Sequence, residues 1–221
     1  MANFFRSVYK LNWKYIIVEI LLIFVGINLA IWFNNWNTEK ALNQNKEVAI
    51  SKIKEEIKNN LEEIITARKV NQNIISAYKD FKEFYGKDSD KVITSPQNFK
   101  VLQSKYPGFF RVKDSIDSES GLKKYLGSTF IELELADLKE IAWETTKSIN
   151  ITNEFNYECL YDLENIYNLQ GRVQNTMDKA VNALQNGKIN ELMTILNIMK
   201  QLDTQLEEHY ISMLEDINNC F

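Results

Sequence analysis

The sequence predicts an all-α protein, in which one N-terminal transmembrane helix continues into a long helix and is followed by a bundle of three to four helices. Three observations predict this fold class. An apolar run near the N-terminus is long enough to cross a bilayer. Most of the remaining chain repeats apolar residues at intervals of three and four, as helices packed on one side do. Only two prolines and seven glycines occur in 221 residues, too few for a turn-rich β domain.

The apolar run defines the predicted transmembrane helix, residues 14–36. Between its polar ends the only strongly polar side chains are Glu19 and Asn28. A helix of roughly 20 residues, at ~1.5 Å per residue, covers the ~30 Å of the hydrocarbon core. A cleaved signal peptide is the alternative. Its apolar region would be shorter, and the best cleavage motif, residues 28–30, begins with a large asparagine where a small residue is needed. We therefore favour an uncleaved anchor.

The residues beside this helix predict its orientation. Residues 1–13 form a short cytoplasmic or interfacial tail that carries basic residues and no acid. Because basic flanks stay in the cytoplasm, the N-terminus is predicted inside and residues 37–221 outside. Aromatic, basic and amide side chains mark both ends of the helix, as is typical of membrane interfaces. We expect these anchors to be Trp13, Lys14, Trp32, Asn34, Asn35 and Trp36.

The domain after the span, residues 37–221, is predicted to be helical. A helix without Gly or Pro is expected to run from the span to about Tyr85. Asn60 and Asn71 interrupt its apolar stripe, which favours packing in a bundle over a two-stranded coiled coil. Further helices are expected at about residues 135–149, 155–184 and 189–217. Irregular structure is expected at about 86–134, with a short helix at 98–105, a helical turn near 122–126 and an extended stretch at 129–134 without a partner strand.

No constellation of residues points to an enzyme. His209 is the only histidine, so a histidine metal cluster or a catalytic triad cannot be assembled from several candidates. The sequence contains no glycine-rich phosphate loop and no Cys-x-x-Cys motif. We expect no catalytic residue, no metal and no cofactor. The net charge of −4 leaves no basic patch for nucleic acid.

The two cysteines, Cys159 and Cys220, match no metal-binding spacing. Outside the cytoplasm they could form a disulfide. Because Cys220 lies near the end of the chain, where helices commonly fray, two free thiols are the favoured interpretation.

Glu19 is the most unusual residue of the predicted span. At 100° per residue, Gly26 and Ala30 lie within about 40° of Glu19 around the helix, and Asn28 lies on the opposite side. Small residues allow two helices to approach closely, and an acid inside a membrane usually faces protein. We expect Glu19, Gly26 and Ala30 to contact a partner helix. Two alternatives stay open: Glu19 packs locally or snorkels to the inner interface without further role, or it carries protons, for which its face supplies no second polar group.

The residues of the span resemble a known anchor. Glu19, Gly26, Ala30 and residues 34–37, Asn-Asn-Trp-Asn, are similar at matching spacing to the anchor of a large uncharacterised family of bacterial single-span inner-membrane proteins. The sequence departs from that pattern at Val18, where the family has Gly, and at Thr38, where Glu is common. A second, weaker block is formed by Ile141-Ala142-Trp143-Glu144, Tyr157-Glu158, Tyr167 and Gln170. The resemblance implies a bacterial inner membrane and a helical periplasmic domain, and it implies no activity.

The expected function is that of an accessory or structural subunit of a larger membrane assembly. Its expected partners are the lipid bilayer and other membrane protein subunits or copies of itself, contacted through the span and the periplasmic helices. Two other functions stay open. The periplasmic domain could sense a small solute and act through a partner, or the chain could be an ion-coupled, stator-like subunit that uses Glu19.

Overall fold

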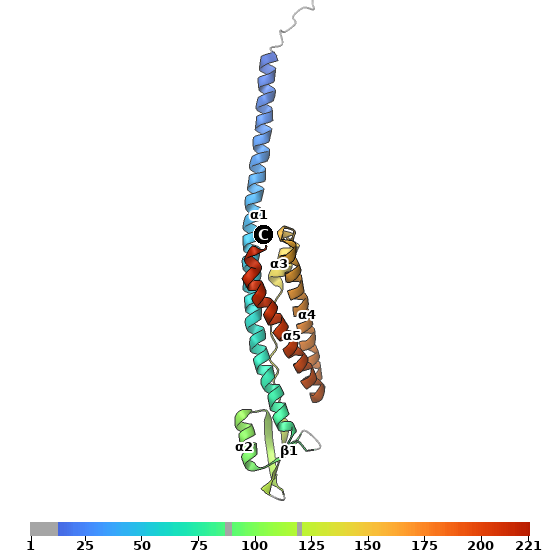
Figure 1. Ribbon diagram of the computed structural model, residues 1–221. Coiled ribbons are helices and arrows are strands. Elements are labelled where there is room, and N and C mark those ends of the chain that lie inside the picture. The colour runs from blue at the N-terminus through green and yellow to red at the C-terminus, as the bar shows by residue number, and fades with distance from the viewer. Residues whose placement is uncertain (1–12, 87–89, 119–120) are drawn as a thin grey trace, which may run out of the picture. The chain divides into compact units, whose positions relative to one another are not determined.

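The computed structural model describes residues 13–86, 90–118 and 121–221 of this chain. The tail predicted at residues 1–13 therefore lies, apart from its last residue, outside the described residues. The chain divides into two compact units, Met1–Val48 and Ala49–Phe221, and the division falls within helix α1 (Trp13–Lys82). The structure is mostly helical, with one long apolar helix at its N-terminal end (Figure 1).

Helix α1 confirms the long helix that the sequence predicts. It is continuous for 70 residues, through Asn34–Asn37 and on to Lys82, because no Gly or Pro interrupts its backbone hydrogen bonds after Gly26. From Ala49 onwards a stripe of the helix is buried at intervals of three and four. The buried positions are Ala49, Ile53, Glu56, Ile57, Asn60, Ile64, Ala67, Asn71, Ile74, Ala77 and Phe81.

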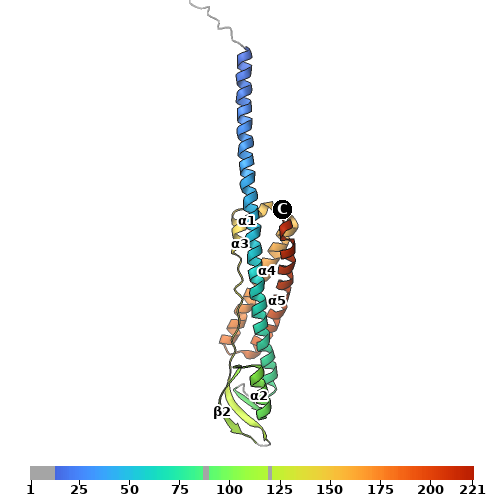
Figure 2. The same cartoon turned by 90° about the vertical axis from the view of Figure 1, so that its left-hand side faces the viewer.

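Helices α4 (Tyr157–Gln185) and α5 (Ile189–Asp216) form a hairpin that packs against the second half of α1, as both Figure 1 and Figure 2 show. The side chain of Asn156 caps α4 by accepting a hydrogen bond from the Cys159 N–H at 2.9 Å. Gly187 provides the positive φ of 67° at which the chain turns between the two helices. Both helices begin and end within a few residues of their predicted bounds.

An extended segment, residues 130–140, crosses this helical unit where a helix was expected from residue 135. The helix there, α3 (Ile141–Ser148), begins six residues later. In the extended segment Ala136 and Leu138 are buried and their neighbours are not, which is the period of two of a strand. The prediction of a helix from residue 135 was wrong because side chains of α1, described below, bind the backbone of this segment.

The all-α prediction is confirmed only in part: the structure is mostly helical, but a sheet lies where irregular structure was expected, at about 86–134. The described residues of this range contain an antiparallel sheet of three strands, in the order β1-β3-β2, and one α-helix. The strands are β1 (Lys91–Thr94), β2 (Phe110–Asp117) and β3 (Lys123–Thr129), and the helix is α2 (Pro96–Lys105). The short helix predicted at 98–105 is thus confirmed, whereas the helical turn predicted near 122–126 lies in β3.

Aromatic packing explains why this region forms a sheet. Phe99 of α2 stacks on Tyr125 of β3, with ring centroids 3.6 Å apart, and Phe81 at the end of α1 packs on Phe110 of β2. Gly127 is required by close strand approach, since a Cβ there would lie 2.2 Å from the carbonyl oxygen of Arg111. These contacts join residues that are distant in sequence, so the spacing of apolar residues along the chain does not predict them.

The two cysteines form a disulfide, Cys159–Cys220, with the Cα atoms 5.3 Å apart, so the free-thiol interpretation was wrong. The C-terminal residues do not fray. The Asn156 N–H donates to the carbonyl oxygen of Cys220 at 2.8 Å, and the Asn156 side chain donates to the carbonyl oxygen of Asn219 at 2.8 Å. These bonds hold Cys220 beside the start of α4, where Cys159 lies.

We expect replacement of both cysteines by serine to lower the free energy of unfolding by about 2–4 kcal/mol, because the disulfide closes a long loop in the unfolded chain. Chemical unfolding followed by circular dichroism would measure the loss. Maleimide labelling of denatured protein provides the control, since it should find thiols only after reduction. Two reactive thiols before reduction would contradict the disulfide.

Candidate functional site

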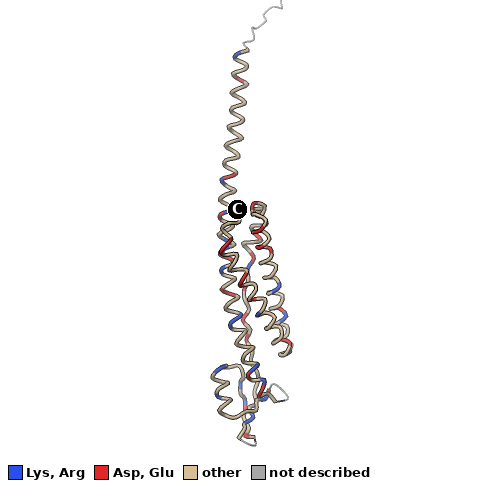
Figure 3. The backbone as a smooth tube through the Cα atoms, in the orientation of Figure 1, with Lys and Arg blue, Asp and Glu red and all other residues tan. Residues whose placement is uncertain are grey.

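The surface of α1 before Val48 is the clearest candidate site. Its most apolar 18-residue window has a mean hydropathy of 2.5, and none of that window is buried. Leu22, Phe24 and Trp32, for example, are each about two-thirds exposed. Figure 3 shows a long uncoloured stretch of this helix, residues 20–38, which contain no Asp, Glu, Lys or Arg, in contrast to the mixed charges of Ala49–Phe221. The helix is long and apolar enough to span a membrane.

Because α1 is a regular helix here, the three residues predicted to contact a partner helix share one side of it. Glu19, Gly26 and Ala30 lie along one side of the helix and are exposed. A Cβ added at Gly26 would meet no atom within 4 Å, so no intramolecular contact requires a glycine at this position. Among the described residues, the carboxylate of Glu19 has no hydrogen-bond or ion-pair partner. The face is therefore available to another molecule.

The opposite side of the helix offers less to a partner. The Asn28 side chain donates a hydrogen bond to the carbonyl oxygen of Phe24 at 2.7 Å. An asparagine satisfied within its own helix can face lipid at a lower energetic cost than an unpaired one. The one polar residue opposite Glu19 within the apolar run, Asn28, is thus engaged within its own helix and supplies no evident second contact face.

The predicted interface anchors lie at the two ends of this apolar surface. Trp13 and Lys14 are exposed in the first turn of α1. At the other end Trp32, Asn34, Asn35 and Trp36 are exposed as well. The Trp36 ring lies beside Phe33, with centroids 5.9 Å apart, and the ammonium of Lys40 lies 5.8 Å from it. An aromatic ring with a cation beside it suits the headgroup region of a bilayer.

A second cluster of polar residues, which the sequence did not predict, is buried in Ala49–Phe221. Glu56 of α1 accepts hydrogen bonds from the backbone N–H of Ala142 at 2.7 Å and from the hydroxyl of Tyr167 at 2.8 Å. It thereby caps α3, which has no cap of its own. Burial, together with the charge of Glu56, raises the pKa of Tyr167, so its hydroxyl remains a donor.

Two asparagines of α1 hold the extended segment. The Asn60 side chain donates to the carbonyl oxygen of Lys139 at 2.7 Å and accepts from its N–H at 2.9 Å. The Asn71 side chain pairs with Glu134 in the same way, at 2.8 and 3.1 Å. Gln170 of α4 accepts from the hydroxyl of Tyr210 at 2.6 Å and from Asn60 at 3.1 Å. These groups satisfy one another, as the polar groups of a buried structural network do.

The sequence contained a signal for this network. Asn60 and Asn71 interrupt the apolar stripe, and a polar residue at a core position must find a buried partner. No feature of the sequence showed that the partner is the backbone of residues 134 and 139.

Asp203 of α5 is a buried carboxyl group that is not fully paired. It is 3% exposed, and its Oδ1 atom has no hydrogen-bond partner. The Arg68 guanidinium lies nearby but is engaged with Glu207 and with the hydroxyl of Thr204. Burial raises the pKa of Asp203 to about 7, and the positive charge of Arg68 opposes that rise.

Among the described residues no group of three or more His, Cys, Asp or Glu side chains could hold a metal ion. No protein-family model, no curated protein and no solved structure matches this chain. A function must therefore be inferred from the surfaces of the molecule itself.

The cost of a single buried asparagine can be measured. We expect Asn60→Ala to lower the free energy of unfolding by about 2–4 kcal/mol, because it leaves the Lys139 N–H without a partner and the Lys139 carbonyl with only the Gln170 amide, at 3.1 Å. Asn59→Ala is the matched control, because Asn59 is exposed on the same helix, and it should change stability by less than about 0.5 kcal/mol. Equal losses in the two variants would show that the amide pairing contributes nothing.

Asp203 predicts a pH dependence of stability. Between about pH 4 and pH 7 the folded state retains a proton on Asp203 that the unfolded state has lost, so this contribution to stability falls as the pH rises through that range. Asp203→Asn, which is neutral at every pH, should be more stable than the wild type by roughly 1–3 kcal/mol at pH 8 and about equally stable at pH 4.

Thermal unfolding between pH 4 and pH 8 would test this difference. Asp162→Asn is the control, since Asp162 is exposed on α4 and should add no such slope. A difference between wild type and Asp203→Asn that stays constant with pH would contradict the ionisation of a buried Asp203.

Proposed function

We propose that this chain is a single-pass subunit of the bacterial inner membrane that serves as an accessory or structural component of a larger membrane protein assembly. The observation that carries the proposal is the uncovered face of α1. An apolar helix of membrane-spanning length carries an unpaired Glu19, with Gly26 and Ala30 on the same side. Small residues admit a second helix at close range, and a partner helix would shield the carboxyl group from lipid.

The disulfide supports the proposed orientation. Disulfides persist in oxidising compartments such as the periplasm and are rare in the cytoplasm. The Cys159–Cys220 bond lies in the unit Ala49–Phe221. A periplasmic location for this unit agrees with the basic tail before the span, which favours a cytoplasmic N-terminus.

In this proposal the second half of α1, α4 and α5 form the periplasmic bundle. Their packing is supported by side-chain bonds from α1 to both other helices, such as Tyr167–Glu56 and Tyr78–Asn190. Exposed helix surfaces of this bundle, together with the span, would contact the other subunits.

Membership of the bacterial anchor family is part of the proposal. Helix α1 is continuous through residues 34–37, the most specific part of that resemblance. In the fold, several residues of the weaker block contact one another or the same buried network. Trp143 stacks on Tyr167 with ring centroids 5.5 Å apart, and Gln170 bonds to Asn60. Trp143, Tyr167 and Gln170 thus meet at one buried network, which supports the interpretation of these three residues as one motif, whereas Ile141 and Tyr157 of the same block are exposed.

Co-purification from membranes would test the proposal. The full-length protein would be isolated in mild detergent beside the variant Glu19→Ala, Gly26→Leu, and bound proteins identified by mass spectrometry. We expect a defined set of membrane proteins with the wild type and at least a fivefold lower yield of them with the variant, since a leucine at position 26 holds the partner helix away.

The opposite face of the same helix supplies a matched control. Asn28→Ala, Leu21→Phe also removes one polar group and adds one large side chain, but about 180° from Glu19. This variant should retain the partners. Wild-type protein that purifies alone, or equal losses in both variants, would contradict a specific contact through Glu19, Gly26 and Ala30.

A further inference from the structure

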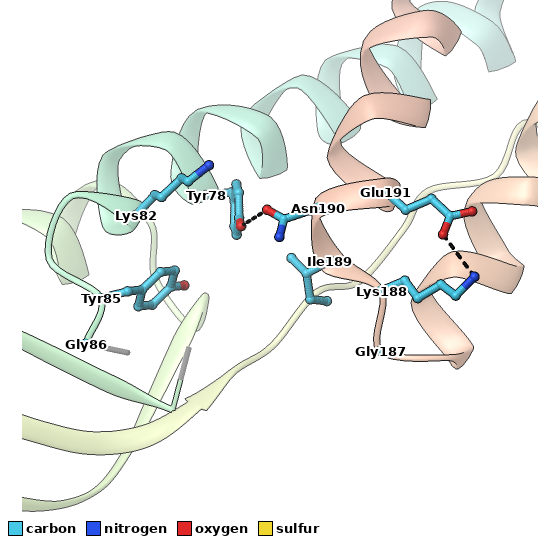
Figure 4. Close-up of a pocket in the computed structure, with 9 residues that line it drawn as sticks. All are labelled: Tyr78, Lys82, Tyr85, Gly86, Gly187, Lys188, Ile189, Asn190 and Glu191. Atoms are coloured by element: carbon cyan, nitrogen blue, oxygen red, sulfur yellow. Dashed lines mark hydrogen bonds and ion pairs between the residues drawn. The ribbon is translucent and has the colours of Figure 1, made fainter. Parts of the chain in front are cut away.

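A cleft of about 760 Å³ lies within Ala49–Phe221, between the C-terminal end of α1 and the turn that joins α4 to α5 (Figure 4). Its two walls are more than 90 residues apart in sequence. The cleft is lined by Tyr78, Lys82, Tyr85, Gly86, Gly187, Lys188, Ile189, Asn190 and Glu191.

One wall of the cleft is aromatic. The rings of Tyr78 and Tyr85 lie 6.2 Å apart at an angle of 51°, and Ile189 lies on the other side of the cleft (Figure 4). Both phenol groups already have partners. Tyr78 donates to Oδ1 of Asn190 at 2.8 Å, and the Tyr85 hydroxyl bonds to that of Thr129 at 2.8 Å. The tyrosines therefore offer ring surface to a ligand and no free hydroxyl.

The charges in the cleft do not cancel. Lys188 pairs with Glu191 at 3.1 Å, so these two residues neutralise each other. Lys82 lies 5.8 Å from the Tyr78 ring and, among the described residues, has no carboxylate within ion-pair distance. One positive charge thus remains in a cleft of a protein whose net charge is −4.

Asn190 adds a neutral donor. Its Oδ1 atom accepts the bond from Tyr78, which leaves the Nδ2 amide without an acceptor among the described residues. The cleft therefore presents an ammonium and an amide as donors, beside ring surface. Such a combination suits the carboxylate of a ligand with a flat body.

We propose that this cleft binds a small aromatic carboxylate. The carboxylate would meet Lys82 and Nδ2 of Asn190, and the ring would lie between Ile189 and the two tyrosines. This site is independent of the contacts proposed for the span. It would add solute recognition to a chain that the span joins to other subunits.

Benzoate is the probe for a test with the full-length protein in lipid nanodiscs. Saturation-transfer NMR of the ligand, with empty nanodiscs as background, would follow the titration. We expect benzoate to saturate below about 10 mM, an affinity in the range of ligands with so few atoms. Benzamide, which has the same ring and no charge, should bind at least fivefold more weakly. No saturation by benzoate, or equal binding of the two compounds, would overturn the proposal.

A pair of lysine variants tests whether benzoate binds in this cleft. Lys82→Met should weaken benzoate binding at least fivefold and leave benzamide binding unchanged, because it removes only the charge. Lys79→Met is the matched control, since Lys79 is exposed on the same helix and does not line the cleft. Both lysines are exposed, and unchanged melting curves would show that both variants fold. Equal effects of the two variants, or no effect of Lys82→Met, would overturn the assignment.

Discussion

The extended segment of residues 134–139 depends on one geometric match. Asn60 and Asn71 of α1 are 11 residues apart, which is about 16.5 Å along a helix and close to three full turns, so both side chains lie on one face. Their partners, Lys139 and Glu134, are five residues apart, which is also about 16.5 Å in an extended chain. Two carboxamides can therefore bind two peptide groups of one straight segment, as a neighbouring strand would.

This match also determines where the neighbouring helices lie within Ala49–Phe221. Because the segment is held extended, α3 begins only at Ile141, where Glu56 reaches its first N–H groups. Trp143 then lies against Tyr167, and Gln170 joins the network from α4. Buried polar groups contribute little net stability compared with apolar packing, but each must be paired. Buried polar groups therefore restrict which residues can contact one another. Leucine or isoleucine at the same positions would allow more alternatives.

The two halves of α1 differ in whether their apolar side chains are buried within the chain. After Ala49 the helix buries one stripe within its own chain and places polar residues there only where a partner exists. Over residues 15–33 apolar side chains surround the helix, apart from Glu19 and Asn28, and none of the apolar window is buried. Nothing within the described chain covers the apolar window. For this reason the proposed contacts with other molecules are assigned to the first half of the helix, whereas the second half packs within the fold.

The sequence by itself determined the elements whose signal is local. The apolar run, the absence of Gly and Pro from α1 after Gly26, and the three-four spacing of α4 and α5 are all local features, and these helices lie where they were predicted. The face of Glu19, Gly26 and Ala30 also follows from helical geometry alone.

Only the tertiary structure decided the sheet, the extended segment, the disulfide and the cleft. The strands β2 and β3 pack against rings from α1 and α2. Residues 135–140 carry a spacing that fits the start of a helix, but Asn60 and Asn71 bind the backbone of this segment and hold it extended. Cys220 meets Cys159 because Asn156 holds the end of the chain. In each case the deciding contact joins residues far apart in sequence, and its energy exceeds the weak preference of the local segment.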